Sequence, residues 1–512
     1  MNGSSQSRSV QHRRGIYLHY LYIVLSAAAM VVLTPVMLSY LGRTAYGVWA
    51  LFTSIAGYSL LLDFGLGTAV ARYTAEYSSA GTTSKLGGLV ASASLLVLGI
   101  GAVVFALFAL IAPFVSVFFN VPPDLKPVSQ VAFVITGLNV ALALFGGVLG
   151  NVIYGYQRVD IWRMCSIVQI VTIAVLSFGF LRLGFGLIGL MVAPTLATCV
   201  VVVTYIFVLK RGPSGFRPHL GSARAELLRE IAPYSLRTFV LGVSSRVLYY
   251  SDYLVLGFFL GPALIVPYEV AYKLCFLSTY LFSGVSTMVF PRCVRLFADR
   301  DSEQLRELYL HVTRVSLLIM TPVAIFLICL GPAFISAWVG ESNFAGMGVL
   351  LVLVVMNMLH AIGTPAAMLL QSSGRNRELM FSELINAGLN VALSIVLVTR
   401  IGLLGVALGT LLSHLCTSFW VILLLPCRSI GLSLKNYFER SVAPPLVAGL
   451  VTAAATWVLS GAVKASSFLE IAVGGVVIFV IYGGVYVLVG VSDEERQLCL
   501  RYLGHIYTAK QE

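Results

Sequence analysis

Apolar stretches about as long as a lipid bilayer is thick recur along almost the whole chain, and they constrain its fold more than any other feature. A hydrocarbon core of about 30 Å needs roughly 20 apolar residues in an α-helix. Fourteen stretches qualify when breaks are placed at charges, Pro and Gly. The expected spans are residues 16–41, 46–70, 87–112, 129–153, 164–182, 186–209, 235–259, 267–290, 312–335, 347–370, 379–399, 402–425, 442–462 and 467–490. The sequence therefore predicts an all-α integral membrane protein with about 14 transmembrane helices.

The composition excludes most soluble classes of protein. Of the 512 residues, 59% are hydrophobic and only 11% are charged, whereas soluble domains carry about 25% charged residues. A soluble enzyme, a disordered scaffold and a nucleic-acid-binding domain are all incompatible with this balance. The remaining question is why the chain nevertheless has a net charge of +12.

The placement of the basic residues answers that question. Of the 33 Lys and Arg residues, only five fall in the expected outward loops. They are Arg43, Lys126, Arg182, Arg400 and Lys464. An excess of Lys and Arg on one side is the positive-inside pattern, which marks the cytoplasmic side. We expect both termini in the cytoplasm, and because the pattern accounts for the basic charge, we expect no nucleic-acid partner.

The chain contains an internal repeat at an offset of 216 to 220 residues. The matches, in chain order, are 40–42 with 259–261, 72 with 292, 157–158 with 374–375, and 186–189 with 402–405. Each repeat holds six spans, so both enter the membrane in the same sense, as in transporters whose parallel repeats are related by an axis along the membrane normal. The fold expected is two parallel six-helix repeats plus two extra C-terminal helices.

This repeat sets the expected domain organisation. We expect a six-helix half at 1–209, a cytoplasmic linker at 210–234, a second six-helix half at 235–425, and spans 13 and 14 with a cytoplasmic tail at 426–512. No connection is long enough to form a separate soluble domain.

Several segments resemble those of a known family when they are taken in order along the chain. They are Leu41-Gly42 with Tyr46-Gly47, residues 62–67 (LDFGLG), Asp252 with residues 256–261 (LGFFLG), residues 268–274 (YEVAYKL), Pro291, and residues 370–375 (LQSSGR). The chain is similar in these segments to the polysaccharide or O-antigen unit flippases of the multidrug, oligosaccharidyl-lipid and polysaccharide exporter superfamily. It departs from the family at Pro267-Tyr268, where relatives usually have Gly-Tyr.

The resemblance implies a function and a set of partners. It implies a flippase that moves an oligosaccharide on a polyprenyl diphosphate from the cytoplasmic to the outer leaflet of a bacterial inner membrane. The substrate and membrane lipids would be its ligands, with a polysaccharide polymerase and assembly proteins as further partners left open. We expect no cofactor, with proton or sodium coupling left open. We expect no enzymatic activity, because the sequence contains no nucleophile–base arrangement and no metal-ligand spacing.

Two basic residues inside the spans are candidates for binding the substrate. A charge near the bilayer centre costs at least about 2.5–3.5 kcal/mol on insertion scales, so it marks a functional site by default. Arg246 lies eleven residues into its span, roughly 16 Å deep, and a guanidinium suits a diphosphate. The alternative is a structural pair with Asp63, Asp252 or a carbonyl. Lys273 follows Glu269 by four residues, so mutual neutralisation is an equal alternative.

Three acidic residues, Asp63, Asp252 and Glu269, are the candidates for ion coupling. Asp63 lies in a Gly-rich segment, where it could carry a proton or a sodium ion. The alternative, which we favour, is that it caps the helix end or pairs with Arg72. Tyr250 and Tyr272 are candidates for stacking on sugar rings, and an interfacial aromatic belt is the alternative.

Two other functions remain open on the sequence. A cation-coupled multidrug antiporter of the same fold typically needs a carboxylate in its first half, where the first two spans contain only Asp63. A non-transporting membrane scaffold for polysaccharide assembly would have no need of Arg246 in mid-membrane.

Overall fold

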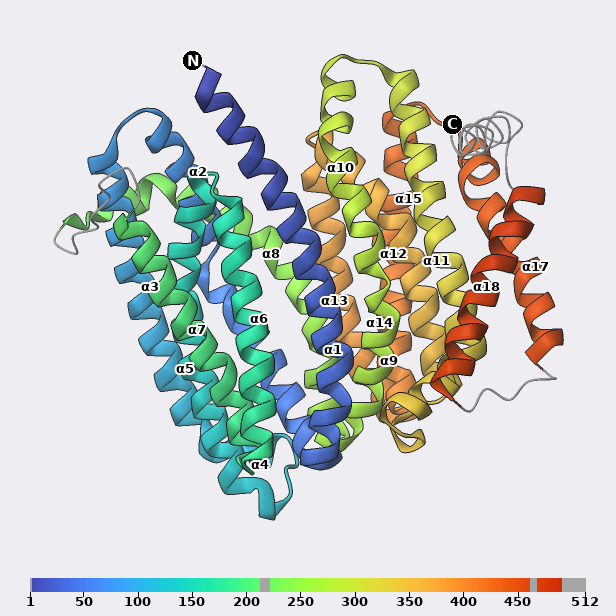
Figure 1. Cartoon of the computed structure of the whole chain (residues 1–512), viewed down its shortest axis with the longest axis horizontal. Helices are drawn as coiled ribbons and strands as arrows, with labels where there is room; N and C mark the ends of the chain where they lie inside the picture. Colours follow the sequence, from blue (N-terminus) through green and yellow to red (C-terminus); the bar gives the residue numbers. More distant parts are fainter. Residues whose placement is uncertain (1, 212–221, 461–466, 490–512) are drawn as a thin grey trace, which may run out of the picture. The chain divides into compact units, whose positions relative to one another are not determined.

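The computed structural model of the chain describes residues 2–211, 222–460 and 467–489 (Figure 1). The regular secondary structure in these ranges is helical, and they contain no strand. The prediction of an all-α fold is confirmed. By residue contacts the chain divides into two compact units, and each is described here by itself.

The first unit comprises Met1–Val266 and Ser394–Gly402. Its principal helices are α1 (Asn2–Ser59), α2 (Leu66–Ser79), α3 (Thr83–Ile111), α5 (Lys126–Gly155), α6 (Val159–Arg182), α7 (Gly186–Arg211) and α8 (Ala225–Phe259). Shorter elements are η1 (Leu60–Asp63), η2 (Ala112–Phe114), α4 (Val115–Phe118), η3 (Pro123–Leu125) and η5 (Pro262–Leu264). Helix α5 packs against α3 and α7, and α6 packs against α1 and α7.

The second unit comprises Pro267–Leu393 and Leu403–Glu512. Its principal helices are α9 (Ile265–Leu277), α10 (Thr279–Ala298), α11 (Ser302–Val339), α12 (Met347–Ser372), α13 (Asn376–Ile401), α14 (Leu403–Cys416), α15 (Ser418–Ser429), α17 (Ala443–Ser460) and α18 (Phe468–Val489). Shorter elements are η6 (Glu341–Asn343), α16 (Leu434–Tyr437) and the π-helical η7 (Phe438–Val442). The long helix α11 contacts α12, α17 and α18, so the last two helices are attached to this unit through α11.

Within the described ranges, ten helical segments are long and apolar enough to cross a membrane. The expected spans 1 and 2 fall together in one of these, Tyr17–Asp63. The spans expected at 235–259, 267–290 and 442–462 are not among the ten. The first of these contains Arg246, Asp252 and several hydroxyl groups, and the second is broken between α9 and α10. The count of 14 spans therefore stays a prediction.

A glycine separates the first two spans inside α1. Gly42 has φ 71° and ψ 173°, a backbone conformation that costs little only for glycine. A few residues on, a Cβ at Gly47 would lie 1.9 Å from the carbonyl oxygen of Pro262. Local sterics thus explain both glycines of the first outer hairpin. Gly42 allows a turn, and Gly47 allows a close approach of the backbone at Pro262.

The grouping of α8 differs from the expected half boundaries. Contacts place α8 with α1, α2 and α3 of the first unit, although the repeat assigns it to the second half. Contacts report packing, whereas a repeat reports shared sequence and chain direction. The division at 210–234 therefore stays a prediction.

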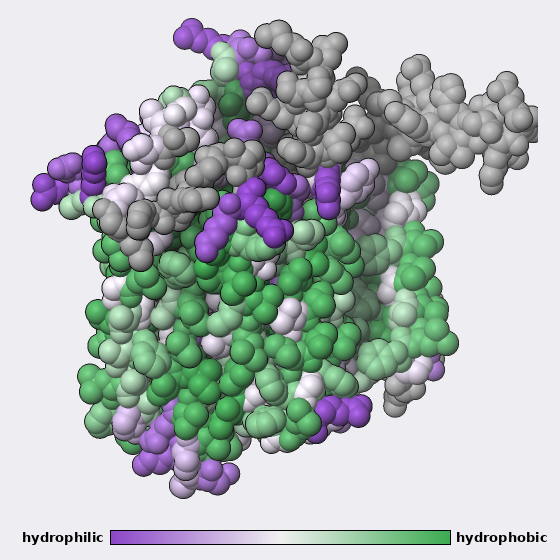
Figure 2. Space-filling view, turned by 60° about the vertical axis from the view of Figure 1, so that its left-hand side comes forward, coloured by the Kyte–Doolittle hydropathy of each residue, from purple (hydrophilic) through white to green (hydrophobic). Residues whose placement is uncertain are grey.

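The surface shows how apolar residues are distributed along the helices. On the face drawn in Figure 2, apolar side chains cover a broad middle band and hydrophilic side chains gather at its two ends. Large apolar residues are exposed along single helices, such as Val103 and Leu110 of α3 and Val175 of α6. Such a band is what a helix bundle presents to lipid, where exposed apolar side chains carry no hydration cost.

Candidate functional site

The second span is interrupted where the Gly-rich segment was noticed in the sequence. Helix α1 gives way to the 3₁₀ turn η1, after which Phe64 has φ 49° and Gly65 has φ 73°. The Oδ1 atom of Asp63 accepts a hydrogen bond of 2.8 Å from the Gly65 N–H. A Cβ at Gly67 would lie 3.2 Å from Asp63 Oδ2. The carboxylate therefore holds the N-terminal end of α2, and the glycines leave room for it.

Asp63 makes no ion pair with Arg72 among the described residues. The Arg72 guanidinium instead lies 4.5 Å from the centre of the Tyr234 ring. Arg72, which the sequence offered as an ion-pair partner for Asp63, is therefore engaged in a cation–π contact instead.

Hydroxyl groups on α8 lie within hydrogen-bond distance of backbone carbonyls at the break. Ser235 Oγ donates to the Phe64 carbonyl at 2.7 Å. Thr238 Oγ1 lies 3.4 Å from the Gly65 carbonyl, and Thr68 donates to the same oxygen at 2.8 Å. Irregular backbone at membrane depth is tolerated only where neighbouring groups satisfy it in this way. Sequence reasoning missed Ser235 and Thr238, although a Gly-rich break in an apolar span signals a need for such donors.

Arg246 lies on α8 in the first unit. Its Nη1 atom is 3.5 Å from the Gly57 carbonyl oxygen, a long hydrogen bond. The guanidinium is also within electrostatic range of Asp63. However, no described carboxylate oxygen of its own unit lies within 4.0 Å of a guanidinium nitrogen, so Arg246 forms no ion pair there. The guanidinium therefore retains donors that its described neighbours in this unit do not use.

Tyr250 packs tightly against α1. A Cβ at Gly57 would lie 2.3 Å from its Cζ atom, and the rings of Tyr58 and Tyr250 are 5.7 Å apart. Its backbone carbonyl accepts a 3.0 Å hydrogen bond from Ser54 Oγ. Asp252, two residues on, is buried with 3% of its surface exposed and lies within electrostatic range of Tyr58.

The remaining candidate residues lie on α9 in the second unit. Lys273 Nζ and Glu269 Oε1 form an ion pair of 2.7 Å, in the arrangement that their spacing of four residues allows. Glu269 is buried, and its Oε2 atom has no hydrogen-bond partner in the described structure. The Tyr272 ring stacks on Phe276 with 4.3 Å between ring centres.

The candidates therefore fall into two sets. Arg246, Tyr250, Asp252 and Asp63 belong to the first unit, while Lys273, Glu269 and Tyr272 belong to the second. Among the described residues, no group of three or more His, Cys, Asp or Glu is placed to hold a metal ion.

The start of α8 is attached to the end of α2. The Tyr77 hydroxyl donates to Glu230 Oε1 at 2.8 Å. Burial, together with this carboxylate, raises the pKa of Tyr77, so the phenol stays protonated and remains the donor. Ser92 Oγ also accepts a 2.8 Å hydrogen bond from the Arg224 N–H. These contacts hold the start of α8 beside α2 and α3.

Comparison with proteins of known structure identifies the fold. The Lipid II flippase MurJ, in an inward closed conformation, superposes with a TM-score of 0.68 at 14% identity, covering 92% of this chain and 98% of MurJ. An inward-facing multidrug resistance MATE family transporter of the MOP superfamily gives 0.67 at 17% identity, covering 81% and 96%. The chain thus has the fold of these multi-pass membrane transporters.

The sequence profile of one family matches more than half of the chain. The family described as polysaccharide biosynthesis protein matches residues 36–345, and the chain belongs to it. The profile of Lipid II flippase MurJ matches residues 259–474.

Curated relatives match parts of the chain at 20% to 29% identity. Teichuronic acid biosynthesis protein TuaB of Bacillus subtilis is 29% identical over 127 residues, which are 24% of this chain and 26% of TuaB. The probable low-salt glycan biosynthesis flippase Agl15 of Haloferax volcanii is 20% identical over 235 residues, 46% of this chain and 49% of Agl15. The uncharacterized membrane protein MJ1068 of Methanocaldococcus jannaschii is 22% identical over 374 residues, 69% and 71% of the two chains. The chain thus spans about a quarter of TuaB and half of Agl15.

Proposed function

We propose that this protein is a flippase that moves a polyprenyl-diphosphate-linked oligosaccharide from the cytoplasmic to the outer leaflet of a bacterial inner membrane. It does so by alternating access, with both termini in the cytoplasm. The family membership supports a role in polysaccharide biosynthesis. The profile match to a lipid II flippase and the description of Agl15 as a glycan biosynthesis flippase support a lipid-linked saccharide as the cargo.

The observation that carries the proposal is Arg246. It is a permanently charged group on α8, within the span expected at 235–259, and its one hydrogen bond to a described residue of its unit is a long contact to the Gly57 carbonyl. A cation kept in a span at such a cost marks a functional site. A diphosphate needs permanent positive charge and several fixed donors, which a guanidinium supplies in bidentate form. In our proposal Arg246 binds the diphosphate of the substrate.

The other candidates take supporting roles in this proposal. Lys273 contacts the substrate only if it exchanges its 2.7 Å partner Glu269, which links substrate binding to the charge of Glu269. Tyr250 and Tyr272 offer ring faces to the saccharide. The half-buried carboxyl group of Asp63 and the buried carboxyl groups of Asp252 and Glu269 are the groups through which a proton or a sodium ion would be coupled to transport.

Three substitutions at Arg246 test the proposal in cells that depend on this gene for surface polysaccharide. Arg246→Glu should abolish surface polysaccharide at normal protein abundance, because it repels the diphosphate. Arg246→Lys keeps the charge but not the bidentate fork, so it should retain partial activity, and Arg246→Ala should fall between the two. Losing a hydrogen bond to a charged group costs about 1.5–3 kcal/mol, which corresponds to roughly a 10- to 100-fold loss.

A matched control is Arg182→Glu. Arg182 lies at the end of α6, where its guanidinium sits over the Phe178 ring at 5.0 Å, and its reversal should leave polysaccharide assembly intact. Wild-type polymer levels in all three Arg246 variants, or loss of folding in all three, would remove the anion-binding role.

The same strains separate the two other functions. A multidrug antiporter predicts that deletion of the gene changes drug susceptibility without loss of surface polysaccharide. A non-transporting scaffold predicts that Arg246→Glu leaves polymer levels unchanged, since charge in mid-membrane has no part in recruiting assembly proteins.

A further inference from the structure

A second arginine in the first unit makes no ion pair with any carboxylate that the structure describes, and it lies far along the sequence from Arg246. Arg163 is near the start of α6, where α6 packs along α1. Its guanidinium carbon is 4.5 Å from the centre of the Trp162 ring and 5.1 Å from that of Tyr22. Asp160, the acidic residue nearest in sequence, is engaged by Arg158 at 3.2 Å.

The rings contact the guanidinium through cation–π interactions, which need none of its N–H groups as hydrogen-bond donors. Cation–π stacking uses the flat face of the group, whereas its N–H donors point outward in the plane. Among the described residues of this unit, no acceptor is found for these donors. An Arg side chain at a membrane boundary normally pairs with a carboxylate, a carbonyl or a lipid headgroup.

A second polar group beside Arg163 also lacks a partner. His19 of α1 lies within electrostatic range of Arg163, and its Nδ1 atom is buried without a hydrogen-bond partner. A buried polar nitrogen without a partner is costly. Arg163 and His19 thus bring two nitrogen-bearing side chains from neighbouring helices to the same place, and the described residues of the unit supply no acceptor for the guanidinium.

Exposed aromatic side chains lie around this place. The Tyr154 ring packs edge-on against Trp162 at 5.3 Å, and Tyr154 is 47% exposed. Tyr17 and Tyr20 of α1 are exposed as well. Tyr and Trp gather at the level of the lipid headgroups, and these rings therefore favour the depth of the phosphates for the positively charged group.

We propose that Arg163 and His19 form a binding site for the phosphate of a membrane lipid headgroup, at the end of α1 and α6 where the rings of Tyr22 and Trp162 orient the guanidinium. The ligand is either a bulk anionic phospholipid or the phosphorylated polyprenyl carrier itself. Binding of the polyprenyl carrier rests on the proposed function. In that case the site holds the carrier before transport. The placement of this end on the cytoplasmic side follows from the basic loops.

The test measures lipid binding to purified protein by native mass spectrometry and by the shift in unfolding temperature. The probes are polyprenyl phosphate and phosphatidylglycerol, with polyprenol and diacylglycerol as their phosphate-free counterparts. All variants are made in an Arg246→Ala background, which removes the other proposed anion site. We expect Arg163→Gln to weaken binding of a phosphate lipid at least about tenfold, and His19→Phe to weaken it less. Arg158→Gln is the matched control and should bind as the background protein does.

The outcomes distinguish the sources. Loss of polyprenyl phosphate binding alone assigns the site to the carrier, and equal loss of both phosphate lipids assigns it to bulk phospholipid. Unchanged binding in Arg163→Gln, or no preference for either phosphate lipid over its phosphate-free counterpart, overturns the proposal. Should Arg163→Gln fail to fold, His19→Phe and Arg163→Lys decide it, since both preserve packing. Failure of the flippase proposal is seen separately, as wild-type polymer levels in the Arg246 variants.

Discussion

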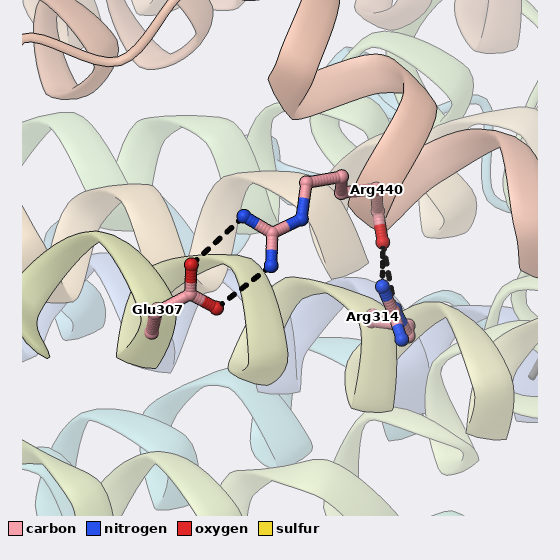
Figure 3. Close-up of polar contacts among 3 residues, drawn as sticks. All are labelled: Glu307, Arg314 and Arg440. Carbon is pink, nitrogen blue, oxygen red and sulfur yellow. Dashed lines mark hydrogen bonds and ion pairs between the residues drawn. The ribbon is translucent and has the colours of Figure 1, made fainter. Parts of the chain in front are cut away.

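Two interactions of different strength hold the segment between α15 and α17 against α11, and their relative contributions can be predicted. Glu307 on α11 and Arg440 on η7 form a bidentate ion pair of 2.8 and 3.0 Å (Figure 3). Arg314, two turns further along α11, donates to the Arg440 carbonyl. Close to this pair, the rings of Tyr309 and Tyr437 stack with 5.3 Å between centres and 13° between planes.

The magnitudes decide which interaction matters. The side chains of Arg440 and Glu307 are 53% and 56% exposed, and an exposed ion pair contributes about 0.2–1 kcal/mol. Tyr437 has 0% of its surface exposed, and truncating a buried aromatic residue to Ala costs about 3–5 kcal/mol. These interaction energies were established for proteins in water. They apply here because α11 has 38 residues, roughly 57 Å, and therefore extends beyond a bilayer hydrocarbon core of about 30 Å.

We therefore expect Tyr437→Ala to lower the unfolding temperature of the purified protein far more than Arg440→Ala does. The assay is thermal unfolding in one detergent, followed by the loss of the monodisperse peak in size-exclusion chromatography. Raising the salt concentration should remove most of the Arg440→Ala effect, because exposed charges are screened, and leave the Tyr437→Ala effect in place. Equal losses for the two variants, or a larger loss for Arg440→Ala, would refute the reasoning.

Three further predictions concern the topology and the first unit. A reporter that is active only outside the cytoplasm should be silent when fused after Lys210 and active after Lys126; the reverse pattern contradicts the orientation. Asp63→Ala should lose about 1.5–3 kcal/mol of stability in thermal unfolding, because the Gly65 N–H loses a charged acceptor. Asp63→Asn should lose less, since its amide oxygen still accepts the hydrogen bond. Equal stability of the two variants and the wild type would exclude the capping role. Gly57→Ala should lower the free energy of unfolding by about 1–3 kcal/mol, because the added Cβ overlaps the Tyr250 ring. Adding Tyr250→Leu should restore part of that stability. A double variant no more stable than Gly57→Ala contradicts the packing argument.

The spacing of apolar residues determined the architecture without help from the structure. A span in lipid must satisfy its own backbone groups, so runs of about 20 apolar residues specify helices whatever surrounds them. The local ion pair of Lys273 with Glu269 was equally accessible, because a spacing of four residues on a helix brings two side chains together. The family was accessible too, since short motifs kept their order along the chain.

The partners of Asp63 and Arg246 were decided by the tertiary structure. Sequence reasoning offered Arg72 to Asp63, yet Arg72 lies over the Tyr234 ring and Asp63 accepts from the Gly65 backbone. Ser235 and Thr238 of α8 bond to carbonyls of residues about 170 positions earlier. No local period in the sequence encodes such contacts, because they depend on how helices pack side by side. The sequence determined that the chain forms membrane helices, while their orientation stays a prediction. The packing of one helix on another decided which polar groups are satisfied by described neighbours.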